Sequence, residues 1–181
     1  MKKVLRPLIL AFLVNIPLLI TAQEYKTAVG AMWGGSVATG ITAKHFLSTG
    51  KDKGNSGIEV IVLSLYRGFM VYGLYERQSH IITGDQYGGF SYYYGAGMHF
   101  GNFEPVAGYC KTDGLGRFTK IGIDGVIGIE YELDYLFGKY DVPFVMSVDV
   151  KPFFDVVGSD CGGIWAFGTS LRYIFGGFSF K

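Results

Sequence analysis

The sequence is short of charge, and the charges it has nearly cancel. Charged residues make up 17% of its 181 residues and the formal net charge is +1, whereas an average soluble domain is about 25% charged. This balance gives no electrostatic basis for binding nucleic acid or for a polybasic contact with a membrane surface. After residue 23 the chain also lacks an apolar run of the roughly 20 residues that a membrane-spanning helix needs. The composition therefore disfavours a nucleic-acid-binding protein and a helical membrane protein.

Metal-binding patterns are missing too. The two cysteines, Cys110 and Cys161, have a spacing that matches no metal motif. His45, His80 and His99 fall on different predicted strands, without the spacing of zinc ligands. We therefore expect no metal and no cofactor.

Glycine and aromatic residues are abundant instead. The chain has 28 Gly, 13 Tyr and 15 Phe, whereas average glycine usage is about 7%. Because glycine costs about 1 kcal/mol in a helix interior, this composition disfavours a helical bundle. It suits strands that pack closely or bend. The length is that of one domain.

The N-terminus has the order of a secretory signal peptide. Positive charges in the first six residues precede an apolar run from Leu8 to Ile20, and the small residue Ala22 follows. We predict cleavage after Ala22, so that residues 1–22 are a signal peptide and residues 23–181 form one barrel domain. A retained N-terminal anchor is the alternative, although the run is shorter than a spanning helix.

The rest of the chain divides into strand-length segments separated by Gly, Asn, Asp and Pro clusters. In Ile121–Leu133 the odd positions are mostly large and apolar, and the even positions are mostly small or acidic. Trp165–Tyr173 alternates in the same way. We predict eight strands, at Lys26–Gly34, Ser36–Phe46, Gly57–Arg67, Phe69–His80, Phe90–Gly101, Phe118–Leu133, Pro143–Phe154 and Ile164–Phe175.

The apolar face of these strands is predicted to point outward, into lipid. The opposite face is rich in Gly, Ala and Ser, which leave room in a narrow interior, and it carries charges in mid-strand. A soluble periplasmic or secreted β-domain with its apolar face inward is the alternative. Aromatic residues gather near strand ends as in an interfacial girdle, at Trp33, Tyr92–Tyr94, Phe144, Trp165 and Tyr173.

Strands can cross a bilayer only as a closed barrel, because every backbone polar group must be hydrogen-bonded internally. Eight is an even number, as in single-chain bacterial barrels. The predicted fold is therefore all-β: an eight-stranded antiparallel up-and-down transmembrane β-barrel, preceded by a cleaved signal peptide. Because side chains just fill the interior of an eight-stranded barrel, an open diffusion porin is excluded.

A family resemblance rests on several short stretches: Gly40–Phe46, Gly73–Glu76, Tyr94–His99, Gly122–Gly125, Gly128–Tyr131, Asp149–Pro152 and Ser170–Tyr173. With these, the chain from Tyr25 to Phe180 resembles the small eight-stranded outer-membrane barrels of the OmpA/OmpX type. The C-terminal Phe178-Ser179-Phe180 looks like the final-strand signal read by the barrel-assembly machinery, although Lys181 follows it. The resemblance implies a monomer in a Gram-negative outer membrane, with lipid and the assembly machinery as its partners.

The predicted inward face collects ionisable side chains, namely Lys44, Glu76, His99, Asp124, Glu130, Asp149, Lys151 and Arg172. If the N-terminus lies in the periplasm, strand direction places Lys44, Glu76, Glu130 and Arg172 in the periplasmic half and the others in the outer half. Because buried charges persist only when paired and hydrogen-bonded, we predict a salt-bridge core that plugs the barrel. A gated proton or ion path, or a small polar ligand site, is the alternative.

Two of these positions stay open. A protonated His99 would balance the charges of the set, which makes it the candidate for a pH-sensitive group, with a neutral hydrogen-bonded histidine as the alternative. Glu76 shares its strand face with Met70 and Leu74, so its inward placement is unresolved.

Glu59 conflicts with its neighbours. It shares a strand face with Ile61, Leu63 and Leu65, which we predict to point outward. Either a β-bulge shifts the register near Glu59, or Glu59 lies at the rim, paired with Lys44. We include Glu59 in the interior polar set.

Catalysis is not expected. The resemblance includes barrels that are lipid A palmitoyltransferases or deacylases, and these need a serine with a histidine and an acid. Ser159-Asp160 lies in the last predicted outer loop without a histidine, because His99 belongs to the interior face. A structural or surface-interaction barrel is the leading interpretation. Lumen-based transport or ligand binding is the second, and lipid A modification is the third.

The predicted outer loops carry both cysteines. The connection from Asn102 to Arg117 holds Cys110 and the connection from Asp155 to Gly163 holds Cys161. Export permits a disulfide, and we predict that one joins these loops. The first two outer turns are shorter than the first two periplasmic connections, the inverse of the usual pattern.

Overall fold

The computed structural model describes residues 26–34, 38–48, 55–65, 68–80, 90–104, 117–133, 143–158 and 165–175. All eight predicted strands occur there: β1 (Thr27–Gly34), β2 (Ala38–Ser48), β3 (Asn55–Leu65), β4 (Gly68–His80), β5 (Phe90–Phe103), β6 (Phe118–Glu132), β7 (Phe144–Val157) and β8 (Trp165–Phe175). These ranges contain no helix long and apolar enough to cross a membrane.

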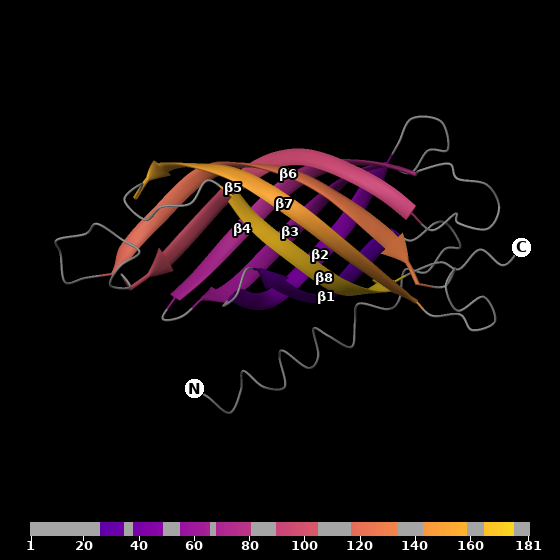
Figure 1. Cartoon of the computed structure of the whole chain (residues 1–181), viewed down its shortest axis with the longest axis horizontal. Coiled ribbons are helices and arrows are strands. Elements are labelled where there is room, and N and C mark those ends of the chain that lie inside the picture. Colours follow the sequence, from indigo (N-terminus) through magenta and orange to yellow (C-terminus); the bar gives the residue numbers. More distant parts are fainter. Residues whose placement is uncertain are drawn as a thin grey trace, which may run out of the picture.

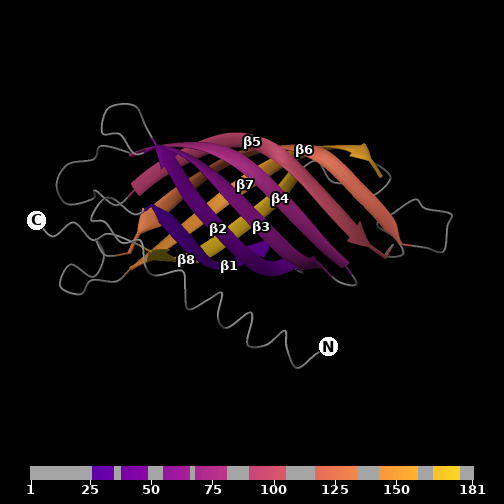
Figure 2. The ribbon, with the colours of Figure 1, turned by 180° about the vertical axis from the view of Figure 1, so that it is seen from behind.

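The strands form a closed barrel. Each strand is antiparallel to the next, and β1 pairs along its whole length with β8, from Thr27 opposite Phe175 to Gly34 opposite Gly168. Figures 1 and 2 show the strands tilted around a common axis, with β1 and β8 side by side. The prediction of an all-β, eight-stranded antiparallel barrel is confirmed.

β5 and β7 are longer than predicted. β5 continues to Phe103 because that residue pairs with Gly68 on one side and Phe118 on the other. β7 continues to Val157 through a register shift in its pairing with β6. Inter-strand pairing, which the pattern of a single strand does not contain, sets both ends.

Along the strands, apolar side chains point out of the barrel and polar ones point in. In β8, Phe167 is 64% exposed, whereas Arg172, on the other face of the same strand, is 0% exposed. In β6 the isoleucines at 121, 123, 127 and 129 are exposed, while the buried residues of the same strand include Lys120, Asp124, Val126 and Glu130. The barrel therefore inverts the arrangement of a soluble protein.

Aromatic side chains pair on the outer surface near the strand ends. The ring centroids of Phe90 and Tyr131 lie 4.4 Å apart, and those of Phe144 and Tyr173 lie 5.5 Å apart. Tyr92 and Tyr94 also face outward, but Tyr93 does not. It is fully buried, because strand alternation turns every second residue inward.

The sequence predicted that small residues line the interior, but the interior side chains are not uniformly small. Large apolar residues fill part of it, in one cluster with Ala28, Phe46, Val145 and Ile174 and another with Met32, Ala38, Ile61, Leu63, Tyr72, Leu74, Tyr93 and Val126. Protein interiors pack densely because a void forfeits dispersion contacts with its lining. Bulky side chains are therefore needed wherever the polar groups leave space.

Glycine is needed where large side chains lie flat against the inner wall. A Cβ at Gly122 would lie 2.4 Å from Cε1 of His99, and a Cβ at Gly128 would lie 2.3 Å from Cζ of Tyr93. His99 is opposite Gly122 and Tyr93 is opposite Gly128 in the β5–β6 register. These two glycines leave room for the imidazole ring of His99 and the phenol ring of Tyr93 to lie over the adjacent strand, β6.

Several predictions concern residues outside the described ranges. These are the signal peptide at residues 1–22, the serine–aspartate pair at 159–160, the cysteines at 110 and 161, and the C-terminal stretch from residue 176. The strand bounds leave residues 35–37 and 66–67 between β1 and β2 and between β3 and β4. At the other end, residues 49–54 and 81–89 join the strands, so these two connections are longer than the first two, as predicted.

Candidate functional site

The structure places all nine ionisable residues of the predicted set inside the barrel. Each is almost completely shielded from solvent: Lys44, Glu59, Glu76, His99, Asp124, Glu130, Asp149, Lys151 and Arg172. They come from β2 through β8 and fall into three groups. The groups are the central network (Lys44, Glu59, Glu76, Gln78, Glu130 and Arg172), the Asp149–Lys151 pair, and the His99 cluster (His99, Lys120, Asp124 and Asp155).

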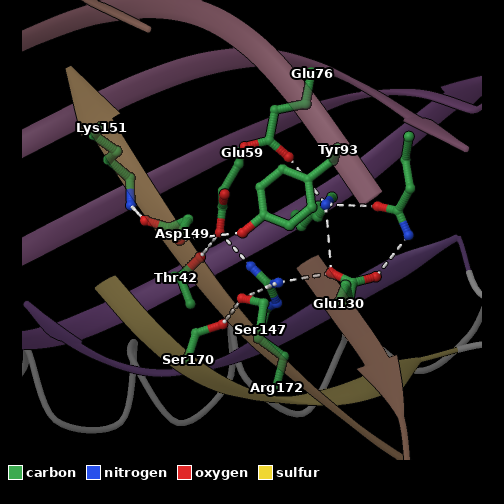
Figure 3. A network of polar contacts seen from close by, with 12 residues as sticks. Thr42, Glu59, Glu76, Tyr93, Glu130, Ser147, Asp149, Lys151, Ser170 and Arg172 are labelled. Carbon is green, nitrogen blue, oxygen red and sulfur yellow. Dashed lines mark hydrogen bonds and ion pairs between the residues drawn. The ribbon is translucent and has the colours of Figure 1, made fainter. Parts of the chain in front are cut away.

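Arg172 is the main cationic centre of the central network. Its Nη2 donates to Glu130 Oε2 at 2.7 Å and to Ser147 Oγ at 2.9 Å, and its Nη1 donates to Glu59 Oε1. Figure 3 shows the guanidinium between these partners. Because Glu59 belongs to β3 and Glu130 to β6, Arg172 links three separate parts of the wall.

Lys44 is the second cationic centre. Its Nζ donates to Gln78 Oε1 at 2.7 Å and lies 3.0 Å from Glu76 Oε2 and 3.4 Å from Glu130 Oε2. The ammonium also lies 4.1 Å from the ring centroid of Tyr93, a distance at which a cation and an aromatic face attract. Gln78 Nε2 in turn donates to Glu130 Oε1 at 2.8 Å, so β2, β4 and β6 are joined across the interior.

Glu59 faces the interior without a bulge. It is opposite Lys44 in the β2–β3 register, and the irregularity in that pairing falls between Phe46 and Ser48. Its Oε1 accepts hydrogen bonds from Arg172 and from Thr42 Oγ1, the latter at 2.5 Å. The prediction that this strand face points outward is wrong.

The residues that share the face of Glu59 are buried with it. Ile61 and Leu63 belong to the apolar interior cluster, while Val60 and Val62 face outward. β3 is apolar on both faces over this stretch, so its alternation gave no indication of which face is the inner one. The same holds in β4, where Leu74 is buried together with Glu76.

Asp149 and Lys151 pair with each other on β7. Lys151 Nζ donates to Asp149 Oδ1, and Tyr93 donates its phenolic hydrogen to Asp149 Oδ2 at 3.1 Å. Tyr93 thus contacts Lys44 of the central network through its ring and Asp149 through its hydroxyl.

The His99 cluster lies toward the end of the barrel where β5 ends and β6 begins. His99 Nδ1 is 3.0 Å from Asp124 Oδ1, and His99 Nε2 is 3.0 Å from Asp155 Oδ1. Lys120 donates to the other oxygen of Asp155. Both ring nitrogens of His99 therefore face carboxylates, which accept hydrogen bonds and cannot donate them.

Sequence reasoning missed four members of these groups. Gln78 and Lys120 share the strand faces of Glu76 and Asp124, so their positions were readable from parity. Asp155 shares the face of Asp149 and Lys151, but it lay beyond the predicted end of that strand. Tyr93 was assigned to the girdle because an aromatic residue suits either face.

The groups show the chemistry of ion pairing. Among the residues that the structure describes, no set of three or more His, Cys, Asp or Glu could hold a metal ion. Side chains from opposite walls meet directly, and Lys44 and Arg172 are each shared between several acceptors. This arrangement can fill and cross-link the interior.

Comparison with known proteins identifies the fold. No protein-family model matches the chain, and no curated protein matches it in sequence. Among solved structures, the chain is similar to the N-terminal β-barrel domain of Pseudomonas aeruginosa OprF, with a TM-score of 0.54 and 14% sequence identity. The similarity covers 84% of this chain and 98% of the OprF domain. The chain therefore has an eight-stranded barrel resembling that domain.

Proposed function

We propose that this protein is an integral outer-membrane β-barrel with a plugged polar interior and a structural or surface-interaction role. The observation that carries the proposal is the sidedness of the strands. Ile127 and Phe167 are 67% and 64% exposed on the outer face, while ion pairs occupy the inside. Soluble monomers rarely expose an apolar surface larger than a few hundred Å². Contact with lipid removes the cost of exposing such a surface to water.

The closed topology supports the same environment. In a bilayer core each unpaired backbone N–H or C=O costs several kcal/mol, so strands are tolerated there only without free edges. Pairing of β1 with β8 removes both edges. Outer-membrane barrels also have an apolar belt flanked by aromatic residues. Here the Phe144–Tyr173 pair lies at the end of the barrel where β7 begins, and the Phe69–Phe100 pair lies at the other end, where β4 begins.

The remaining parts of the proposal concern biogenesis and the loops. Residues 1–22 direct export and are removed, and the barrel-assembly machinery inserts the mature chain as a monomer. Cys110 and Cys161 form a disulfide between neighbouring outer loops. The proposed role involves no catalysis and no cofactor.

A conductance measurement separates the plugged barrel from a lumen-based transporter. Because Lys44 and Arg172 bind partners on opposite walls, the purified protein in a planar bilayer should give no stable conductance steps. Heat-modifiable gel migration serves as the control that the inserted protein is folded, and an open porin serves as the positive control. Reproducible ohmic steps from the folded protein would instead favour ion or solute transport.

A further inference from the structure

The central network contains one more acid than base. Lys44 and Arg172 supply two positive charges, whereas Glu59, Glu76 and Glu130 supply three negative charges when ionised. The nearby Asp149–Lys151 pair is neutral as a whole and cannot balance the difference. A lone ionised carboxylate in a dry interior is strongly unfavourable, so a buried excess charge is normally neutralised by a proton or an ion.

Hydrogen bonding identifies the least compensated carboxyl group. Glu130 accepts hydrogen bonds on both oxygens, from Gln78 on Oε1 and from Arg172 on Oε2. Glu59 accepts two on Oε1. By contrast, neither oxygen of the fully buried Glu76 accepts a hydrogen bond from any residue that the structure describes, and its one ion-pair contact is Lys44, a cation that it shares with Glu130. Oε2 of Glu59 also accepts no hydrogen bond from the described residues.

The oxygens without hydrogen bonds belong to neighbouring carboxyl groups. Figure 3 shows the carboxyl groups of Glu59 and Glu76 next to one another beside the Tyr93 ring. Two carboxylates can only repel at that separation. With one proton between them, a single O–H···O bond satisfies one orphaned oxygen on each residue.

The geometry points to a buried proton-binding site in which Glu76 is protonated and donates a hydrogen bond to the ionised Glu59. Glu76 holds the proton because Glu59 already accepts from Arg172 and Thr42, which favours its charged form. With that proton the central network has two positive and two negative charges.

The whole surroundings of the pair are consistent with one bound proton. The inward-facing polar groups that surround it are Thr42 and Lys44 on β2, Gln78 on β4, Tyr93 on β5, Glu130 on β6, Ser147 and Asp149 on β7, and Ser170 and Arg172 on β8. A monovalent cation is the competing ligand. Such a cation needs several oxygen ligands, and no metal-holding acidic group of three occurs among the described residues.

Infrared spectroscopy of the folded protein at neutral pH tests the site. The wild type should show the C=O stretch of a protonated carboxylic acid, and that band should shift on transfer to D2O. The variant E76Q, which mimics the protonated form, should lack the band. The control E132Q, at the end of β6 and outside the network, should retain it. Absence of an H/D-sensitive carboxylic-acid band from the wild type, or its persistence in E76Q, overturns the proposal.

The pH dependence of unfolding gives a second readout. Near neutral pH the unfolded chain has an ionised Glu76. The folded chain keeps the proton, so unfolding releases it. Each pH unit should therefore raise the unfolding constant of the wild type about tenfold relative to the unfolding constant of E76Q. Equal slopes contradict the proposal, and stability that depends on sodium concentration but not on this proton identifies a cation site instead.

Discussion

Replacing Arg172 with methionine should lower the free energy of unfolding by about 3–5 kcal/mol, because the change leaves buried carboxylates without their cation. Arg172 is fully buried, and it donates to Glu59, Glu130 and Ser147. Methionine fills similar volume but supplies no donor. Urea titration of the protein in detergent micelles, followed by loss of strand circular dichroism, measures the effect.

The matched control for this variant is Arg117→Met. Arg117 is exposed immediately before β6 begins, so the same change should alter stability by no more than about 0.5 kcal/mol. Adding Glu59→Gln to the R172M protein should recover part of the loss, because it removes one of the stranded charges. If R172M unfolds at the same urea concentration as the wild type, the ion network does not hold the barrel together.

An arginine placed at Ile127 should cost about 2–4 kcal/mol of folding free energy in lipid vesicles, because it puts a charge into the middle of the apolar belt. Ile127 is 67% exposed and lies between Tyr94 and Val150 on the neighbouring strands. On a solvated surface the same substitution changes stability by about 0.5 kcal/mol or less. Urea-dependent folding into vesicles measures the difference.

Depth supplies the control for Ile127→Arg. Val156 is also exposed on the outer surface, but it lies next to the end of β7. Val156→Arg should therefore cost only about 0–1 kcal/mol. Equal small costs at both positions would mean that the apolar surface contacts water rather than lipid.

The extent to which the sequence predicted this protein depends on how different the two faces of each strand are. In β6 isoleucines alternate with glycines and acids, so the inward positions of Asp124 and Glu130 followed directly from the pattern. In β3 both faces are apolar, and Ile61 was assigned to lipid although it packs inside. Alternation separates the two faces but cannot identify the inner one when their chemistry is alike.

The ion pairs themselves were beyond the reach of the sequence. Strand register puts Lys44 opposite Glu59, and the sequence suggested that pair. In the folded barrel Glu59 instead binds Arg172, a residue 113 positions away, and Lys44 lies against Glu76 and Glu130. Those partners are set by the narrow, closed shape of the barrel, which brings side chains from opposite walls within reach of each other.

If the apolar face of every strand contacts acyl chains, the two tryptophans should report that contact most directly. Trp33 and Trp165 are 46% and 55% exposed on the outer surface, and they are the two tryptophans of the chain. After reconstitution into vesicles whose lipids carry bromine on their acyl chains, their fluorescence should be strongly quenched relative to unbrominated vesicles. Aqueous iodide should have little effect. Emission that iodide quenches and brominated lipid leaves unchanged would contradict the account.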